Sequence, residues 1–302
     1  MIKLSVHMMT FNCEKYIDQS LKSVLRQQTT FPFEVIISDD ASTDNTYQII
    51  TDIAEKHDFI KPHQNKDNLG ILKNFVATLH RCKGEYVFDL AGDDWLSDPY
   101  ALQTLVDELD RNPSYGFVDS GFDVFHERTG KIKPFFNKKI LLGTKEDYIR
   151  FQQVYGNYLM GCCFRTKTLL EIVDFTRYIE IGIDYEDYPI LTDLVFHADF
   201  GLIPKALSVY RKHRLSHSNN TESFLKTKLF FADKYDFSEQ DIQQIHKAHH
   251  NHQLHNASLI SDKKSGRQHY KPLQQPILRN FVYFLSSQSH LARRFFTLFR
   301  KI

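Results

Sequence analysis

Short apolar strands alternate with amphipathic helices over the first 120 residues, and this alternation restricts the possible fold more than any other feature. Residues 4–9, 33–37 and 86–90 are apolar runs of the kind that form buried strands. Between them, apolar residues recur at helical spacing over 17–25, 47–53 and 72–79. A further helix is expected after Pro99. Such alternation with short links predicts an α/β domain with helices flanking a mixed, mostly parallel sheet.

Polar residues follow three of these strands where each one ends. The three segments are Thr10-Phe11-Asn12, Asp39-Asp40 and Asp93-Asp94. In a mostly parallel sheet the carboxyl ends of the strands share one edge, and ligands bind there. One acidic pair at a strand end is often only a turn or a helix cap. Two pairs at one edge repel unless they face a cation or a ligand with many donors, so the pattern predicts a ligand site.

The charge distribution bears on which partners the chain can bind. The formal net charge is only +1, but residues 263–302 hold nine Lys and Arg and no Asp or Glu. The preceding part therefore keeps 29 of the 38 basic residues and all 37 acidic ones, and is net acidic. A protein that reads nucleic acid lines its binding surface with basic residues, so we expect no nucleic-acid partner. An acidic body suits an enzyme that handles a metal ion or phosphate.

Other features of the composition point to the cytoplasm. The sequence has no run of 18 apolar residues, and its N-terminus lacks the pattern of a signal peptide. The four cysteines follow no metal or disulfide spacing. We therefore expect a cytoplasmic protein with no transmembrane helix.

Four motifs carry a resemblance to a known family and occur in its order and spacing. They are Leu4-Ser5-Val6 with residues 10–17, the acidic segment 33–46, residues 68–74, and residues 84–87 with 92–99. Over residues 3–215 the chain resembles the family 2 glycosyltransferases, which are inverting enzymes of the GT-A fold, and especially the bacterial surface-polysaccharide members. The resemblance implies sugar transfer from a nucleotide sugar, with a UDP-sugar favoured, to a hydroxyl of a glycan or lipid-linked acceptor.

The resemblance implies a donor-binding role for residues near the ends of the first strands. Thr10 and Phe11 would pack on the nucleotide or hydrogen-bond it. Asp40 would accept a hydrogen bond from the base, and Asp39 would steady the loop. Lys73 would reach the ribose or the diphosphate. The whole predicted donor-binding set is Thr10, Phe11, Asn12, Glu14, Asp39, Asp40, Lys73 and Asp93.

A divalent metal site is implied where the family has its DxD motif. Asp93, which would also touch the ribose, and Asp94 would hold Mn²⁺ or Mg²⁺, with His213 as a third ligand. Such an ion bridges two phosphates and stabilises the charge on a leaving nucleoside diphosphate. The sequence departs from the motif at Ala91, where the family has its first acidic residue. We therefore expect a weakened metal affinity.

The acceptor side of such an enzyme needs a general base that removes the proton of the attacking hydroxyl. The resemblance implies an Asp from an acidic pair that opens a helix in the acceptor half. Glu186-Asp187 stands at that place, with Asp187 as the base. The alternative is that both are only favourable charges in the first turn of a helix.

The predicted domains follow from the extent of the resemblance. Residues 1–218 form the GT-A domain, with a nucleotide-sugar half at 1–115 and an acceptor half at 116–218. Residues 219–302 form a helical extension with a basic amphipathic tail. Apolar residues from Ile277 to Ile302 predict peripheral contact with the inner face of the membrane, or packing on the protein or in a homodimer. The five histidines from His246 to His255 are expected on an exposed polar helix.

Two other functions stay open at this point. A sugar-1-phosphate nucleotidylyltransferase would use a similar sheet and metal, but it would carry a Gly-rich basic loop after the first strand. Residues 10–16 contain no Gly and only Lys15 as a basic residue. The other alternative, suggested by Ala91, is a catalytically weak nucleotide-sugar-binding protein. The presence of Asp93, Asp94 and Asp187 argues against it.

Overall fold

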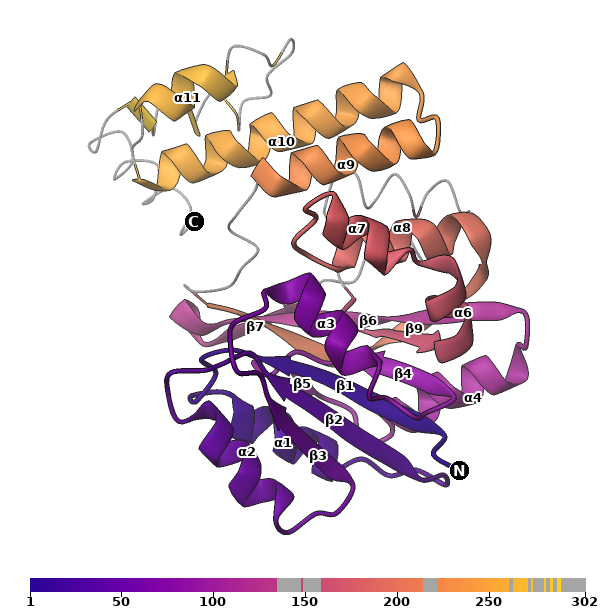
Figure 1. Cartoon of the computed structure of the whole chain (residues 1–302). Helices are drawn as coiled ribbons and strands as arrows, with labels where there is room; N and C mark the ends of the chain where they lie inside the picture. Colours follow the sequence, from indigo (N-terminus) through magenta and orange to yellow (C-terminus); the bar gives the residue numbers. More distant parts are fainter. Residues whose placement is uncertain are drawn as a thin grey trace. The chain divides into compact units, whose positions relative to one another are not determined.

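A nine-stranded sheet organises the first of the two units into which the chain divides (Figure 1). The first unit comprises residues 1–149 and 157–216, and the second comprises 150–156 and 217–302. The computed structural model describes residues 1–134, 148, 159–213, 222–260, 263–270, 273, 280, 283–284 and 287–288.

Four parallel strands form the part of the sheet that is nearest the N-terminus in sequence. They are β1 (Leu4–Thr10), β2 (Phe33–Asp39), β3 (Ile60–Gln64) and β4 (Tyr86–Asp89), in the order β3-β2-β1-β4. The expected strands over 4–9, 33–37 and 86–90 are thus confirmed. Because β1 lies between β2 and β4, the strand order reverses there, and the carboxyl ends of these strands border a crevice where ligands bind.

The remaining strands make the sheet mixed, as expected. They are β5 (Trp95–Leu96), β6 (Tyr115–His126), β7 (Lys131–Pro134), β8 (Cys162–Arg165) and β9 (Asp199–Lys212). Strand β8 runs antiparallel between β4 and β6, whereas β6 and β9 are parallel. Strand β5 pairs antiparallel with β9, and β7 pairs antiparallel with β6.

Helices cover both faces of this sheet. Figure 1 shows α1 (Ile17–Leu25), α2 (Thr46–Ala54) and α4 (Ala101–Arg111) on one face. On the other face lie α3 (Ile71–Leu79), α6 (Thr166–Ile172), α7 (Phe175–Glu180) and α8 (Asp187–His197). A short 3₁₀ turn, η1 (Glu127–Thr129), links β6 to β7. The helices expected over 17–25, 47–53 and 72–79 and after Pro99 are confirmed.

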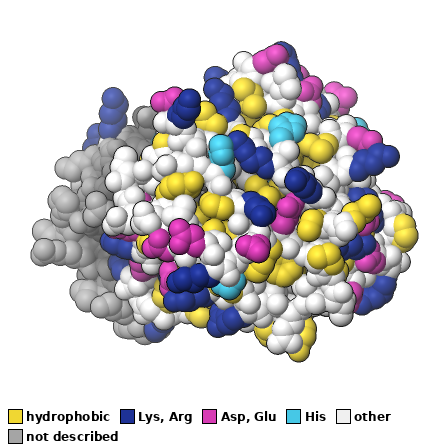
Figure 2. All heavy atoms as spheres, turned by 60° about the horizontal axis from the view of Figure 1, so that its bottom comes forward, with side chains coloured by type: hydrophobic (Ala, Val, Ile, Leu, Met, Phe, Trp, Pro, Cys, Tyr) yellow, Lys and Arg dark blue, Asp and Glu magenta, His cyan; other side chains and the backbone are white. Residues whose placement is uncertain are grey.

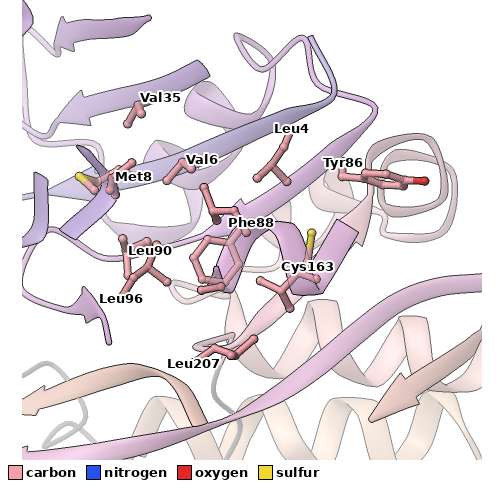
Figure 3. Packing of buried hydrophobic residues seen from close by; sticks show 14 of the residues in the cluster. Leu4, Val6, Met8, Val35, Tyr86, Phe88, Leu90, Leu96, Cys163 and Leu207 are labelled. Carbon is pink, nitrogen blue, oxygen red and sulfur yellow. The ribbon is translucent and has the colours of Figure 1, made fainter. Parts of the chain in front are cut away.

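Side chains alternate along β1 between these two faces. Leu4, Val6 and Met8 are fully buried in the apolar cluster that Figure 3 draws, together with residues of β4 and β8. Each such side chain contributes roughly 1.5–3 kcal/mol of stability on burial. Ser5 and His7 point to the opposite face, where His7 contacts α3. The polar residues in this strand therefore mark the face on which side-chain hydrogen bonds form.

The second unit is helical over its described residues. It contains α9 (Glu222–Lys234), α10 (Glu239–Ile260) and α11 (Lys263–Tyr270), and α10 packs against both of the others. Of the apolar residues predicted to form the tail stripe, Phe284 stacks on Tyr270 with ring centroids 4.5 Å apart. The other members of that stripe lie outside the described residues. Among the described helices, none combines the length and apolar character needed to cross a membrane.

Charged side chains of both signs are interspersed on the face of the molecule drawn in Figure 2. Apolar side chains are scattered between them in small groups.

Candidate functional site

Side-chain hydrogen bonds centred on Asp39 join the ends of β1 and β2. Its carboxylate accepts hydrogen bonds from Thr10 Oγ1, from the backbone N–H of Ser42 and from Gln64 Nε2, each at 3.1 Å. The Ser42 hydroxyl also donates to it. Asp39 is fully buried, and a buried carboxylate is tolerated only when such donors replace water. Asp39 therefore positions the loop that follows β2.

Asn12 and Glu14 extend this network along the loop after β1. The Asn12 N–H donates to Ser42 Oγ at 2.8 Å, and Asn12 Oδ1 accepts from the N–H of Thr43 at 2.9 Å. Glu14 Oε2 accepts from the backbone and side-chain nitrogens of Asn45 at 3.2 and 3.1 Å. Asn12 has a φ of 52°, a left-handed conformation that Asn tolerates better than most residues. Both side chains thus fasten one loop to the other.

Asp40 orders a third segment, the one that leads into α3. Its carboxylate accepts hydrogen bonds from Asn65 Nδ2 at 2.8 Å and from the N–H groups of Leu69 and Gly70 at 2.8 and 3.0 Å. Gly70 has a φ of 78°, which favours glycine. The contact between Asp40 and a nucleotide base stays a prediction.

Phe11 and Lys73, two members of the predicted donor-binding set, are exposed. Phe11 is 48% exposed beside the left-handed Asn12, and Lys73 lies on the outer side of the first turn of α3. An apolar ring and a cation left in solvent are suited to contact an incoming ligand. Their roles in donor binding stay predictions.

Gly92 brings the acidic segment after β4 against the end of β1. Its N–H donates to the carbonyl of Met9 at 3.0 Å. A Cβ atom at position 92 would lie 2.4 Å from Thr10 Cγ2, so only glycine fits without displacing Thr10. This close approach places Asp93 and Asp94 next to the donor-side network.

Asp93, Asp94 and the end of β9 form the predicted metal site. Asp93 Oδ2 lies 2.9 Å from His213 Nε2, although 120 positions separate the two residues. Asp94 is 3% exposed, and its Oδ1 accepts a hydrogen bond from the N–H of Arg211 at 2.6 Å. The structure therefore brings Asp93 and His213 together, whereas the Asp94 carboxylate bonds the Arg211 backbone. Among the described residues, these three do not form a group whose ligand atoms all lie within 4.8 Å of one another.

Electrostatics at this place favour a bound cation. Burial, and then the charge of Asp93, raise the pKa of Asp94 well above its ordinary value. A divalent ion between the two carboxylates would replace lost hydration and offset their repulsion. Oxygen ligands with one imidazole suit Mn²⁺ or Mg²⁺, and 2.9 Å between Asp93 Oδ2 and His213 Nε2 is a normal separation for two ligands of one ion. Asp93 and His213 thus fit two ligands of such an ion, and the part of Asp94 stays a prediction.

Arg211 supports the predicted metal site through contacts that the sequence analysis did not predict. Its guanidinium lies 4.7 Å from the ring centroids of both Tyr16 and Trp95. Its Nε donates to the carbonyl of Asp93 at 2.8 Å, and its terminal nitrogen donates to Gln19 Oε1 at 2.6 Å. Arg211 is only 6% exposed, so it holds the Asp93 backbone in place.

Glu186 and Asp187 lie where α8 begins, and they are poorly supplied with hydrogen-bond donors. Asp187 Oδ1 accepts from the N–H of Leu159 at 2.9 Å. Burial raises the pKa of Asp187 to about 7, with the charge of Asp89 acting in the same direction and the Leu159 hydrogen bond opposing it. Burial and the Asp187 charge raise the pKa of Glu186 well above its ordinary value. Glu186 Oε2 is buried with no hydrogen-bond partner among the described residues.

Asp89 and His7 form a buried pair that the sequence analysis missed. Asp89 Oδ1 lies 2.7 Å from His7 Nδ1, and His7 Nε2 lies 3.0 Å from the carbonyl oxygen of Phe75. Asp89 also acts electrostatically on Asp94 and on Asp187. The charge of Asp89 therefore acts both on the predicted metal site and on the acidic pair at the start of α8. The sequence held a signal for this pair: a charged residue, Asp89, ends one apolar strand, and a histidine, His7, lies inside another.

The fold and this arrangement of acidic groups define a GT-A glycosyltransferase scaffold. The family model described as Glycosyl transferase family 2 matches residues 5–171. The chain therefore belongs to glycosyl transferase family 2, and the family predicted from the motifs is confirmed.

Relatives and solved structures extend this result. An uncharacterized protein of Mycobacterium tuberculosis, Rv1520, is 40% identical over 111 residues, which are 36% of this chain and 32% of that protein. The chain thus spans only about a third of the length of this curated relative. The structure of Staphylococcus aureus TarS 1–349 in complex with UDP-GlcNAc has a TM-score of 0.63 at 19% identity, covering 96% of this chain and 83% of that chain.

A second structural neighbour comes from an archaeon. The mannosyltransferase PcManGT from Pyrobaculum calidifontis, in complex with GDP-Man and Mn²⁺, has a TM-score of 0.55 at 16% identity. The match covers 98% of this chain and 83% of that one. At these identities the two structures show a shared fold.

Proposed function

We propose that the protein transfers a sugar from a nucleotide sugar, with a UDP-sugar favoured, to a hydroxyl of a glycan or lipid-linked acceptor, with inversion at the anomeric carbon. The synthesis of a bacterial surface polysaccharide, such as a capsule or O-antigen, is the proposed setting. The observation that carries the proposal is the contact of Asp93 with His213, next in sequence to the buried Asp94, with Asp89 acting electrostatically on both Asp94 and Asp187. The UDP-GlcNAc bound to TarS, a protein of similar fold, supports the choice of a UDP-sugar.

A divalent metal, Mn²⁺ or Mg²⁺, is part of this proposal. Asp93, Asp94 and His213 would hold the ion, which supplies positive charge to the leaving diphosphate. The Mn²⁺ in the complex of PcManGT supports this assignment. Arg211 holds the Asp93 backbone and the Asp94 carboxylate, so it keeps these ligands in place.

Asp187 is the proposed general base. Its ionised carboxylate would take the proton of the acceptor hydroxyl as that oxygen bonds to the anomeric carbon. The bond from that carbon to the diphosphate oxygen breaks, and the nucleoside diphosphate leaves with the electron pair. A pKa of about 7 suits this role, because the group then accepts protons while being ionised near neutral pH. At the neighbouring Glu186, burial and then the charge of Asp187 raise the pKa well above its ordinary value.

A panel of nucleotide sugars tests the donor. Ligands that bind the folded state raise its thermal stability, so UDP-, GDP- and dTDP-sugars can be compared with and without Mn²⁺. We expect the largest rise in Tm from a UDP-sugar with Mn²⁺. A larger rise from a GDP-sugar would overturn the choice of nucleotide, and no rise from any of them would overturn the proposal.

Release of nucleoside diphosphate separates an enzyme from a catalytically weak binding protein. With the donor that stabilises best, the enzyme hydrolyses or transfers the sugar and frees UDP. Binding without release supports the alternative. Formation of a sugar-1-phosphate from the donor and pyrophosphate would instead indicate a nucleotidylyltransferase.

Membrane contact through the C-terminal residues is a further part of the proposal. The protein would work in the cytoplasm, on the inner face of the membrane, where a basic tail can bind anionic lipid. Deleting residues 272–302 should release it from anionic liposomes. Loss of a homodimer or of folding on deletion, with no liposome binding by the full chain, would show that the tail packs instead.

A further inference from the structure

Three histidines of the second unit converge, and none of them belongs to the site described above. His249 and His250 lie on α10, and His269 lies on α11, which runs beside α10 in Figure 1. One ring nitrogen from each lies within 4.8 Å of the other two. His269 is 7% exposed, and the other two are half-buried. The expectation of an exposed polar helix is therefore wrong for His249 and His250, because α11 covers them.

The three rings surround a common point. Their centroids are 5.6 Å apart for His249 and His250, 5.6 Å for His249 and His269, and 5.3 Å for His250 and His269. This is nearly an equilateral triangle. Rings that only stack in pairs have no reason to form a triangle, whereas three ligands of one ion are arranged in this way.

The nitrogen separations are close to those of a metal site. His250 Nδ1 and His269 Nδ1 are 3.0 Å apart. With zinc–nitrogen bonds of about 2.0–2.1 Å, two ligands of a tetrahedral ion lie roughly 3.3 Å apart. The ligand nitrogen of His249 lies within 4.8 Å of those of His250 and His269.

The protonation of these rings suits metal binding. Burial, followed by the neighbouring histidines, lowers the pKa of His249 to about 4. The same causes lower the pKa of His250. At neutral pH these two rings are therefore uncharged, which is the form of imidazole that binds metals.

The ligand type selects among metals. All three members of the cluster are histidines, without a carboxylate. Imidazole ligands suit Zn²⁺, Cu²⁺ and Ni²⁺, whereas Mg²⁺ and Mn²⁺ prefer carboxylate oxygens. This cluster and the Asp93 site are thus suited to different ions.

We infer that His249, His250 and His269 bind one transition-metal ion of the Zn²⁺ class and so join α11 to α10. Solvent fills the fourth position of a tetrahedral ion with three protein ligands. The ion stabilises the packing of the second unit and takes no part in sugar transfer. Because it ties two helices that are separate in sequence, its binding should stabilise the folded state.

Metal content of the purified full chain tests this site. The protein is stripped with a chelator, reloaded with Zn²⁺, dialysed and measured for bound zinc. We expect one tightly held equivalent in the wild type and its loss in His249→Gln and in His269→Gln. His252→Gln is the matched control, because His252 is exposed on the same helix and lies outside the cluster. It should keep the ion.

Two further measurements distinguish a site from a folding defect or from zinc at the catalytic carboxylates. Asp93→Asn should still hold the zinc equivalent, and Co²⁺ substituted for it should give the visible absorption of a tetrahedral site. Zn²⁺ should raise the Tm of the wild type and of His252→Gln but not of His249→Gln, whose position is only half-buried. No zinc retained by folded wild type, or equal retention by both cluster variants, overturns the inference.

Discussion

Two sets of carboxylates, Asp39 with Asp40 and Asp94 with Asp187, differ in what surrounds them. Asp39 accepts four hydrogen bonds and Asp40 accepts three, from strand ends and loops nearby. Among the described residues, Asp94 and Asp187 each accept one, from a backbone N–H. Hydrogen bonds to a charged group contribute about 1.5–3 kcal/mol each, so the first set is held in place by many donors of the protein.

The comparison separates scaffold from reactive groups. The pKa is raised for Asp94, Glu186 and Asp187, because burial removes water from them and few donors replace it. Carboxylates of this kind are stabilised most by a bound cation or by a proton taken from a substrate. We propose that the carboxylates with few donors take part in the chemistry, and the following predictions test this division.

Replacing Asp187 should have the largest effect. Asp187→Asn removes the proposed base and should lower turnover by about 10²–10⁴ while UDP binding stays nearly unchanged. Turnover and UDP affinity are measured separately, by product release and by calorimetry. If turnover and UDP affinity fall together, Asp187 is a structural carboxylate, and the division between the two sets of carboxylates fails.

Replacing Asp94 should have the next largest effect. Asp94→Asn keeps the shape and an oxygen for the Arg211 N–H, but it removes a charge that the metal needs. We expect turnover to fall by at least about 10², together with weaker Mn²⁺-dependent donor binding. Full activity of this variant, or of the wild type in excess chelator, would exclude the metal role.

The pH dependence of turnover should show the raised pKa of Asp187. Because the base acts when ionised, turnover should fall about tenfold per pH unit below pH 7 and level off above it. Asp119 is the matched control, since burial also raises its pKa to about 7 although it bonds to Tyr148. Asp119→Asn should keep the acid limb of the profile. Loss of the limb in that variant would assign it to Asp119.

The same shift has an opposite consequence for stability. The folded chain holds a proton on Asp187 that the unfolded chain has already lost between pH 3.8 and about 7. This group therefore makes the folded state less stable as pH rises through that range.

Replacing Asp39 should have the smallest effect on chemistry and a clear effect on stability. Asp39→Asn weakens the charge-assisted hydrogen bonds that join three loops. We expect the free energy of unfolding to fall by about 2 kcal/mol. That loss lowers Tm by about 4–8 °C in a domain of this size. Asp67→Asn, at an exposed position nearby, should change neither. An unchanged Tm for Asp39→Asn would show that its donors add little.

The first strands and helices were predictable because each is short and marked by its own pattern. Residues 4–9 form an apolar run, and the repeat from Ile17 to Leu25 has helical spacing. Strand β3 was not predicted, because Lys61 and Pro62 interrupt its apolar character. An edge strand tolerates such residues, since one side of it has no partner in the ladder.

At the site, the gathering of acidic pairs was predictable but their separate roles were not. Strand ends alone place Asp39 and Asp93 at one edge. The donors that distinguish them come from residues distant in sequence, such as Leu159 for Asp187 and Arg211 for Asp94. Likewise, 82 positions separate His7 from Asp89, so only the parallel pairing of β1 with β4 brings them together.

The pairing of β5 with β9 fixes the spacing of two ligands of the predicted metal site. Trp95 pairs with Val209 and Leu96 with Ser208, so the number of residues from this pair to Asp93 and to His213 sets where both ligands lie. One residue added between this strand pair and either ligand would shift that ligand by about 3.3 Å. This is more than the 2.9 Å that separates Asp93 Oδ2 from His213 Nε2. Insertions are therefore tolerated far better in the chain between Leu96 and Ser208 than in the short segments that join this strand pair to Asp93 and to His213.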